Sequence, residues 1–153
     1  MYLLFGDSHA ESLRPALDSK MFHCEAYPGW TSEEACRNSA WTLEVALQED
    51  HYAGCVLLWG ANDAGMPLYQ SLECILELKK TAEKYVGRVW VMGYPGLEYP
   101  ETFAKTFKAA YLGMPRAAPL SEDATHLSSD GALIWAAWLS ERLGSSERLG
   151  STK

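Results

Sequence analysis

The chain has 153 residues, the usual size of one domain, and 48% of them are hydrophobic, so it can bury a core of its own. Its formal net charge is −7, and no cluster of Lys and Arg could follow a phosphate backbone, so nucleic acid is not an expected partner. No apolar run approaches the roughly 18 residues of a transmembrane helix, so we expect no membrane insertion.

The start of the chain lacks the basic segment and the long apolar run of a signal peptide. We therefore expect a cytoplasmic protein, unless the sequence is a mature or trimmed form. Cys24, Cys36, Cys55 and Cys74 lie singly along the chain, without CxxC spacing or paired histidines. They indicate buried free thiols rather than a zinc site, and no metal or other cofactor is expected.

Short apolar runs alternate with longer amphipathic segments along the chain. We expect strands at residues 1–6, 21–27, 54–59 and 88–92, and at most a short fifth strand within 112–120. Helices are expected at residues 10–18, 32–49, 67–85, 100–112 and 131–143. This alternation predicts an α/β fold, in which a parallel sheet of four to five strands has right-handed crossovers and helices on both faces.

In the helix expected at 32–49 we place four residues toward the core, namely Ala35, Trp41, Val45 and Ala46. The amphipathic helix expected at 131–143 carries Leu133, Ile134, Trp138 and Leu139. We expect residues 1–144 to form a single domain. The tail repeats the six residues SERLGS, which are too few for a structural repeat, so residues 145–153 are expected to be a frayed end.

The first expected strand runs into Gly6-Asp7-Ser8-His9. The loop after such a strand lies at the carboxyl edge of the sheet, where open α/β folds bind ligands. Ser8 is therefore a candidate nucleophile. Taken alone, this stretch is explained as well by a strand followed by a helix cap, because Asp and Ser are common capping residues.

Polar residues in small-residue loops also follow the other strands. Gly29 follows the second strand, GAND at 60–63 follows the third, and DATH at 123–126 precedes the last helix. The loops after parallel strands emerge at one edge, so these residues can meet in space. Acyl transfer needs a serine nucleophile, a histidine base, a carboxylate that orients the base, and donors for the oxyanion.

These four blocks, in this order, resemble those of the SGNH hydrolases, also called GDSL-type esterases and lipases. The resemblance implies that Ser8 is the nucleophile, His126 the base and Asp123 its orienting acid. It also implies an oxyanion hole made of the backbone N–H groups of Ser8 and Gly29 and the side chain of Asn62. The implied fold is a flavodoxin-like three-layer α/β/α sandwich, and the implied activity is hydrolysis of carboxylic esters or thioesters.

The chain departs from the family pattern at two points. His9 stands where the name-giving GDSL motif has leucine, and Gly29 lies between a proline and a tryptophan. His9 also adjoins the nucleophile, but neighbours on a turn usually point apart, so His126 is the expected base. His23 and His51 are expected to be structural or on the surface.

Several other residues lie near the expected loop edge. His9, Trp30, Trp59 and Tyr94 are candidates for lining a substrate pocket, with core packing as the alternative for the aromatic residues. The two aspartates next to the motif residues, Asp7 and Asp63, are expected to cap a helix or to hold a loop through hydrogen bonds.

The function that we expect is a serine esterase acting on a small-molecule, short-acyl carboxylic ester. A carbohydrate O-deacetylase, an acyltransferase or a thioesterase could use the same site. A binding module without turnover on the same scaffold is the alternative from another class. The sequence indicates neither the natural substrate nor the oligomeric state.

Overall fold

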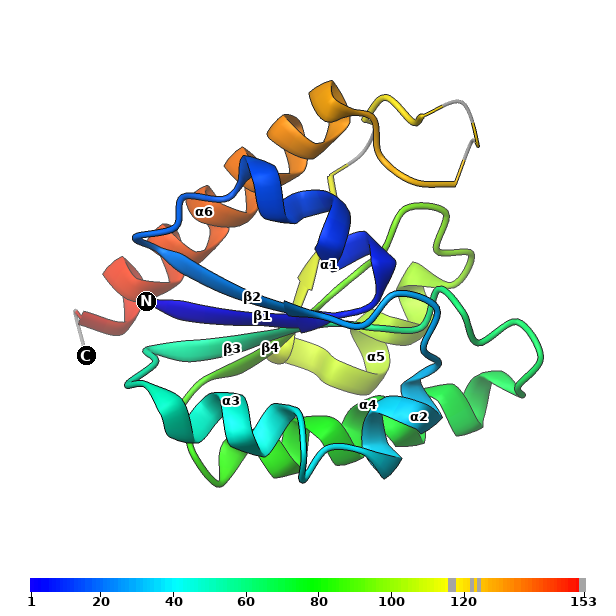
Figure 1. The fold of residues 1–153 in the computed structure, drawn as a ribbon, viewed down its shortest axis with the longest axis horizontal. Coiled ribbons are helices and arrows are strands. Elements are labelled where there is room, and N and C mark those ends of the chain that lie inside the picture. Colours follow the sequence, from blue (N-terminus) through cyan, green and yellow to red (C-terminus); the bar gives the residue numbers. More distant parts are fainter. Residues whose placement is uncertain (116–117, 122, 124, 152–153) are drawn as a thin grey trace.

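The computed structural model describes residues 1–115, 118–121, 123 and 125–151. A parallel sheet crosses the middle of the molecule, with the strand order β2-β1-β3-β4-β5 (Figure 1). Its strands are β1 (Tyr2–Gly6), β2 (Phe22–Ala26), β3 (Gly54–Leu58), β4 (Val89–Met92) and β5 (Tyr111–Gly113). This is the strand order of the flavodoxin-like fold. In that fold, ligands bind between β1 and β3, where the direction in which successive strands are added to the sheet reverses.

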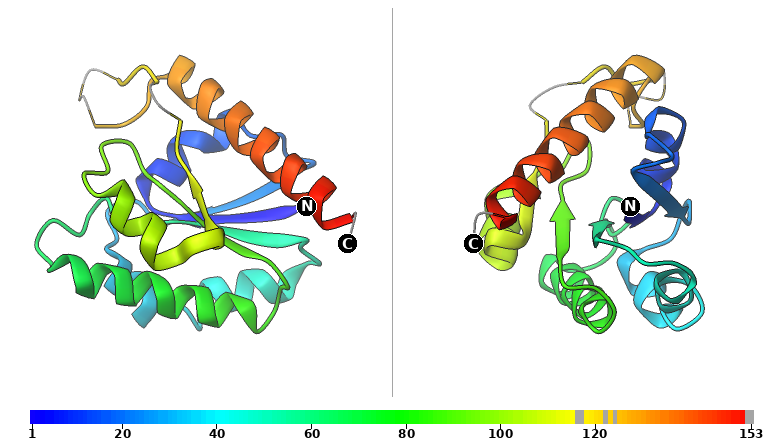
Figure 2. Two further views of the ribbon diagram at one scale, coloured as in Figure 1. Left: turned by 180° about the vertical axis from the view of Figure 1, so that it is seen from behind. Right: turned by 90° about the vertical axis from the view of Figure 1, so that its left-hand side faces the viewer.

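Helices cover both faces of the sheet. They are α1 (Ser8–Leu13), α2 (Ser32–Arg37), α3 (Leu43–Glu49), α4 (Leu68–Glu83), α5 (Pro100–Phe107) and α6 (Ser129–Ser151), with short 3₁₀ turns η1 (Arg14–Ala16) and η2 (Lys108–Ala110). Helices α1 and α6 lie on one face and α2 to α5 on the other (Figures 1 and 2). No helix within the described ranges is long and apolar enough to cross a membrane.

The strand side chains alternate between two apolar clusters, one on each face. Leu3, Phe5, Cys55, Leu57, Val89 and Val91 pack against α2 to α5. Tyr2, Leu4, Val56, Leu58, Trp90 and Met92 pack against α1 and α6. Burial on both faces explains why the strands read as unbroken apolar runs. The predicted three-layer α/β/α sandwich is confirmed.

The helix predicted at 32–49 is two helices. Thr31 and Glu34 form a capping box that starts α2. The side chain of Asn38 then donates to the carbonyl of Glu34, and Thr42 donates to the carbonyl of Asn38, so side chains compete with the helical ladder. The break puts Trp41 in the connection, where its exposed fraction is 82%, and the prediction that it faces inward is wrong.

The inward placement of Val45 in α3 is also wrong, because this residue is 41% exposed. In α6, Leu133 and Ile134 are 58% and 44% exposed. The buried stripe of α6 consists instead of Ala132, Trp135, Ala136, Leu139 and Leu143, whose spacing of three to four residues keeps them on one side of the helix. Tertiary packing selected one of two apolar stripes that the sequence offers.

Two helices in the last third of the chain have boundaries that differ from the predicted ones. The helix predicted at 100–112 ends at Phe107, because Tyr111–Gly113 pairs with β4 as the edge strand. Helix α6 is longer than predicted, beginning at Ser129 and ending at Ser151. The repeat that we expected to fray therefore has a helical backbone through its second copy, while residues 152–153 lie outside the described residues.

Gly6 ends β1 where the sheet leaves no room for a side chain. A Cβ at this position would lie 2.5 Å from the carbonyl oxygen of Leu58 and 2.9 Å from the Cβ of Ala10. The glycine therefore lets β1 run beside β3 and turn at once into α1. This places the residues after Gly6 at the switch point of the sheet.

Candidate active site

Ser8 is the first residue of α1, directly after the switch-point strand. Asp7 caps the helix, because its Oδ1 accepts a hydrogen bond from the backbone N–H of His9 at 3.0 Å. Helix capping by Asp7 therefore leaves the Ser8 side chain free to act as a nucleophile, since the cap residue precedes the serine. The interpretation of this stretch as a helix cap is correct for Asp7.

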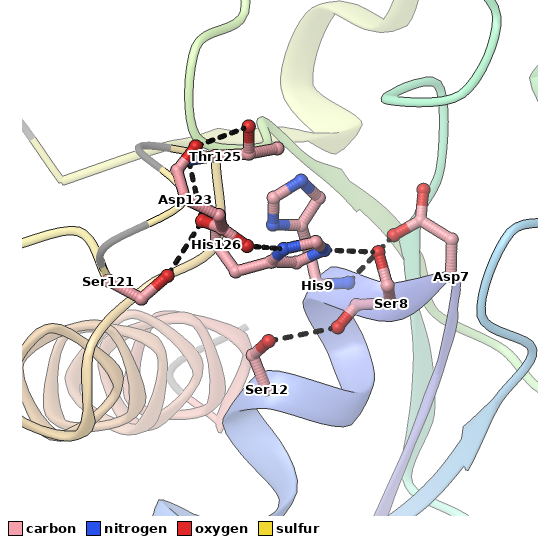
Figure 3. A network of polar contacts seen from close by, with 8 residues as sticks. All are labelled: Asp7, Ser8, His9, Ser12, Ser121, Asp123, Thr125 and His126. Carbon is pink, nitrogen blue, oxygen red and sulfur yellow. Dashed lines mark hydrogen bonds and ion pairs between the residues drawn. The ribbon is translucent and has the colours of Figure 1, made fainter.

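Ser8 belongs to a chain of hydrogen bonds with two residues far away in the sequence. Its Oγ lies 2.8 Å from Nε2 of His126, and Nδ1 of His126 lies 2.7 Å from Oδ2 of Asp123 (Figure 3). An ionised carboxylate only accepts hydrogen bonds, so Nδ1 carries the proton of the neutral ring and Nε2 accepts from the serine hydroxyl. The geometry of the three side chains suits removal of the serine proton.

Asp123 is held by its own loop. Its Oδ1 accepts from Oγ of Ser121 at 2.6 Å and from the backbone N–H groups of Thr125 and His126, each at 2.9 Å. The bond from Ser121, followed by those from His126, holds the pKa of the Asp123 carboxyl well below its usual range. Asp123 therefore stays ionised, and the 51% exposure of its side chain to solvent favours the charged form as well. Ser121 was not among the site residues expected from the sequence.

Asn62 connects the loops on either side of β1. Its Nδ2 donates to the backbone carbonyl of Trp30 at 2.9 Å, which joins the loop after β3 to the loop after β2. This bond uses one of the two amide hydrogens, and the second one is available for another acceptor. The proposed use of Asn62 as an oxyanion donor stays a prediction.

Gly29 lies in the tight turn that follows β2. The backbone N–H of Trp30 bonds to the carbonyl of Tyr27 at 3.2 Å, and Gly29 has a φ of 83°. Proline followed by a glycine with positive φ is the signature of a type II turn. Gly29 is thus needed for the turn itself, and its role as an oxyanion donor also stays a prediction.

Asp63 is a buried anchor for the loop that carries Asn62. Its Oδ1 accepts from the backbone N–H of Ser32 at 2.9 Å, and its Oδ2 accepts from the hydroxyls of Ser32 and Ser71, each at 2.5 Å. These bonds connect the loop to α2 and α4. The expectation that Asp63 holds the loop agrees with this arrangement.

Asp7 is fully buried next to this anchor. Burial raises the pKa of its carboxyl to about 6, and the negative charge of Asp63 adds to the shift. The backbone N–H groups of His9 and Ala61 act in the opposite direction. Asp7 bonds to the backbone rather than to a histidine ring, so it supports the loops around Ser8.

His9 lies against the ring of His126. Its exposed fraction is 2%, its ring centroid is 5.1 Å from that of His126, and it stacks on Tyr94 at 6.3 Å. Burial, followed by the charge of His126, lowers the pKa of His9 to about 4. His9 is therefore neutral near pH 7, and it is His126 that bonds to the Ser8 hydroxyl.

A cavity of about 570 Å³ lies between the loops after β3 and β4. Its wall includes Gly60 and Ala61, which precede Asn62, and Tyr94, whose ring stacks on His9. The side chains of Met66, Leu68, Glu98, Tyr99 and Phe103 line it as well. These five residues were not expected from the sequence, although their positions after the third and fourth strands were a signal for them.

Of the four candidate pocket residues, Tyr94 alone lines this cavity. Trp59 is fully buried in the core, with its ring 5.1 Å from that of Phe5, so its placement in a pocket is wrong. Trp30 stacks on Tyr27 at 4.4 Å and is partly buried. His9 is covered by the rings of Tyr94 and His126.

The described residues hold no group of three or more His, Cys, Asp or Glu side chains that could bind a metal ion. Of the four cysteines, Cys55 is buried, whereas Cys24, Cys36 and Cys74 are partly exposed. The prediction that all four are buried is therefore wrong for three of them.

No protein-family profile matches the sequence, and no curated protein matches it. Solved structures match its fold over nearly the whole chain. The esterase EstA from Pseudoalteromonas sp. has a TM-score of 0.72 and 15% identity over 96% of this chain and 98% of EstA. A GDSL-like lipase from Bacteroides thetaiotaomicron has a TM-score of 0.67 and 15% identity over 95% of this chain and 88% of the lipase.

The chain has the SGNH hydrolase fold. The acetylxylan esterase Axe2 from Geobacillus stearothermophilus shares it, with a TM-score of 0.69 and 12% identity over 94% of each chain. At these identities the similarity lies in the fold. The Ser8, His126 and Asp123 side chains meet where this fold brings together the loops that follow β1 and precede α6.

Proposed function

We propose that this protein is a serine esterase that hydrolyses carboxylic esters through Ser8, His126 and Asp123. The observation that carries the proposal is the continuous chain of hydrogen bonds, 2.8 Å from Ser8 to His126 and 2.7 Å from His126 to Asp123. These are the distances at which a base can take a proton from a nucleophile.

The reaction has two steps. Ser8 Oγ attacks the ester carbonyl carbon while Nε2 of His126 takes its proton, and Asp123 stabilises the imidazolium that forms. The leaving alcohol takes that proton from Nε2, which leaves Ser8 acylated. A water molecule then attacks the acyl group with His126 as its base, and the carboxylic acid departs as Ser8 regains its proton.

The oxyanion of the tetrahedral intermediates needs donors on the side opposite His126. We assign this role to the backbone N–H groups of Ser8 and Gly29 and to the second amide hydrogen of Asn62. Ser8 is at the first position of α1, where the backbone N–H has no partner within the helix. The bond from Asn62 to Trp30 holds the amide over the end of β1.

Neither Ser8 nor His126 lines the cavity beside Tyr94, and we assign it to the substrate because its wall includes Gly60 and Ala61, which precede Asn62. Its described lining contains Asp63 and Glu98 but no Lys or Arg. Burial raises the pKa of Tyr94 to about 12, and the charges of Asp63, Asp7 and Glu98 add to the shift. The negative potential disfavours phosphate-bearing substrates such as acyl-CoA. Aromatic rings and carboxylates suit a hydroxyl-rich alcohol, so our second candidate is removal of short acyl groups from sugars, the chemistry named for Axe2.

A fluorophosphonate probe tests the proposed nucleophile. The phosphonate reacts with an activated serine, the chemistry of the inhibitor named for the EstA structure. We expect the probe to label the wild type and Ser12→Ala, whose serine lies one turn further along α1, but not Ser8→Ala. Wild-type protein that is neither labelled nor active on short aryl esters contradicts the proposal and supports a binding module.

A substrate panel tests the assignment of the cavity. We expect kcat/KM on O-acetylated sugars and on neutral acetyl esters to exceed that on acetyl-CoA. Glu98→Lys should raise relative activity on acetyl-CoA, with Glu98→Gln as the control that removes charge without reversing it. A preference of the wild type for the thioester, or acyl transfer that outpaces hydrolysis, contradicts simple ester hydrolysis.

A further inference from the structure

His9 is a buried titratable residue that the two steps above do not use. It directly follows Ser8, yet its side chain turns away from the serine hydroxyl and lies beside the ring of His126 (Figure 3). The two ring centroids are 5.1 Å apart, within the range of aromatic pairs, and their planes are tilted by 37°. The ring of His9 also stacks on that of Tyr94, with an angle of 19° between the planes.

Space filling alone is a poor account of this residue. Nδ1 of His9 is buried and has no hydrogen-bond partner among the residues that the structure describes, and a buried polar atom without a partner lowers stability. An aliphatic side chain of similar size would occupy the same position without that penalty. The aromatic ring therefore calls for a contribution that depends on its contact with His126.

The charge state of His9 decides what this contact does. Burial, followed by the charge of His126, lowers the pKa of His9 to about 4, so His9 is neutral when His126 is protonated. A neutral aromatic ring attracts a cation that lies over its face. Asp123, by contrast, contacts His126 at the edge of its ring through Nδ1.

We propose that His9 is a positioning residue that stabilises the imidazolium form of His126 with the face of its neutral ring. The inference rests on the proposed function, because His126 becomes an imidazolium in the esterase reaction. His9 touches neither the scissile carbonyl nor the Ser8 hydroxyl in this mechanism. It acts through His126, whose ring it also holds in the plane that reaches Ser8 and Asp123.

Within the described part of the chain, few other charged or titratable groups lie around the two rings. Asp123 and Ser8 contact His126 directly, and the buried Asp7 interacts with it electrostatically. Tyr94 and Asp123 are the further groups that face His9. Substitution of His9 leaves all four in place, so a changed titration of His126 would report on the His9 ring.

Two substitutions of His9 distinguish the effect of its aromatic face from that of its ring nitrogens. His9→Leu removes the face, and we expect it to lower kcat on a short aryl ester about threefold to tenfold with little change in KM. The acid limb of the pH–rate profile should move to lower pH by about half a unit to one unit, because the imidazolium is less stable. His9→Phe keeps an aromatic face and should restore both values to within about twofold of the wild type.

A measurement that needs no turnover separates this proposal from the proposed function. The NMR titration midpoint of the His126 ring, assigned by its loss in His126→Ala, should fall in His9→Leu and be restored in His9→Phe. His23→Leu is the control for loss of a histidine remote from this site. If His9→Leu does not fold, His9→Met supplies an unbranched apolar side chain for the same comparison.

The outcomes are distinct. An unlabelled, inactive wild type overturns the esterase proposal and leaves the NMR titration as the test of His9. The role of His9 is overturned if His9→Leu or His9→Met has the wild-type kcat, the wild-type acid limb of the pH–rate profile and the wild-type NMR titration midpoint of the His126 ring. The role is equally overturned if His9→Phe loses as much as His9→Leu, since the aromatic face would then be irrelevant.

Discussion

The β3–α4 loop and the β5–α6 loop both serve the proposed active site, but they are anchored in opposite ways. In the first, which carries Asn62, the side chain of Asp63 is 6% exposed and accepts three hydrogen bonds from α2 and α4. In the second, which carries His126, the side chain of Asp123 is 51% exposed and most of its bonds come from its own loop.

The difference in exposure between Asp63 and Asp123 suggests that the first carboxylate serves mainly stability and the second mainly the reaction. A buried carboxylate is costly to desolvate, so it is tolerated only where it satisfies several donors, and its removal leaves those donors unpaired. An exposed carboxylate needs no such compensation and remains ionised, as an orienting acid must. We therefore expect substitutions in the β3–α4 loop to affect folding as well as activity, and substitutions in the β5–α6 loop to affect activity.

The largest effect should come from His126→Asn, which keeps a polar side chain but removes the base. Loss of a triad histidine lowers kcat by about 10⁴-fold or more, because the serine proton then has no acceptor. The free energy of unfolding in urea should stay within about 0.5 kcal/mol of the wild type, as for other surface substitutions. A loss of stability comparable with that of a core substitution would show that the β5–α6 loop, like the β3–α4 loop, contributes to folding.

Asp63→Ala should be the most destabilising change in either loop. It leaves the Ser32 backbone N–H and the Ser32 and Ser71 hydroxyls without acceptors, and we expect a loss of about 3–5 kcal/mol in the free energy of unfolding. The matched control is Asp123→Ala, where solvent can replace the lost partner. Equal losses of stability in the two variants would show that exposure does not distinguish the anchors.

Asn62→Ala tests the catalytic side of the buried loop. Loss of one oxyanion donor typically lowers kcat by about 10²–10³-fold with little change in KM. Asn38→Ala is the control, because it also removes an asparagine amide that donates to a backbone carbonyl, but away from the site. A kcat within a few-fold of the wild type would remove Asn62 from the proposed oxyanion hole.

Asp7→Asn tests how much the buried Asp7 carboxylate lowers the free energy of unfolding as the pH rises. Because the pKa of Asp7 is raised from 3.8 to about 6, the folded chain binds this proton more tightly than the unfolded chain does. The contribution of Asp7 to stability is therefore greatest below about pH 4 and falls as pH rises to about 6. Relative to wild type, Asp7→Asn should gain about 2–3 kcal/mol between pH 4 and pH 8, measured by urea unfolding. A difference that does not change with pH would show that Asp7 titrates normally.

Much of the fold could be predicted because its signals are local. The runs at 1–6, 54–59 and 88–92 contain β1, β3 and β4, since a strand buried on both faces must be apolar at every position. The helix boundaries were less predictable. The interruption at 38–42 depends on the Asn38 and Thr42 side chains bonding to backbone carbonyls, and the end of α5 depends on β5 pairing with β4.

The candidate site was predictable in its residues but not in its contacts. Ser8 and Asn62 could be chosen because they follow glycines at the ends of expected parallel strands, and His126 because the four blocks resemble those of the SGNH hydrolases. The position of Trp59 in the core and that of His9 against His126 could not, because each depends on which way a side chain turns at the end of its strand or helix. The cavity likewise requires two loops to approach each other.

The sequence by itself determined the alternation of strands and helices and the order of the four polar blocks, because apolar spacing and turn residues act within a few positions of the chain. Only the tertiary structure decided that Ser8 and His126, 118 residues apart, share a hydrogen bond, and that His9 faces the base. Such contacts depend on how the sheet orders its strands and on which apolar stripe each helix buries, and both are settled by packing over the whole domain.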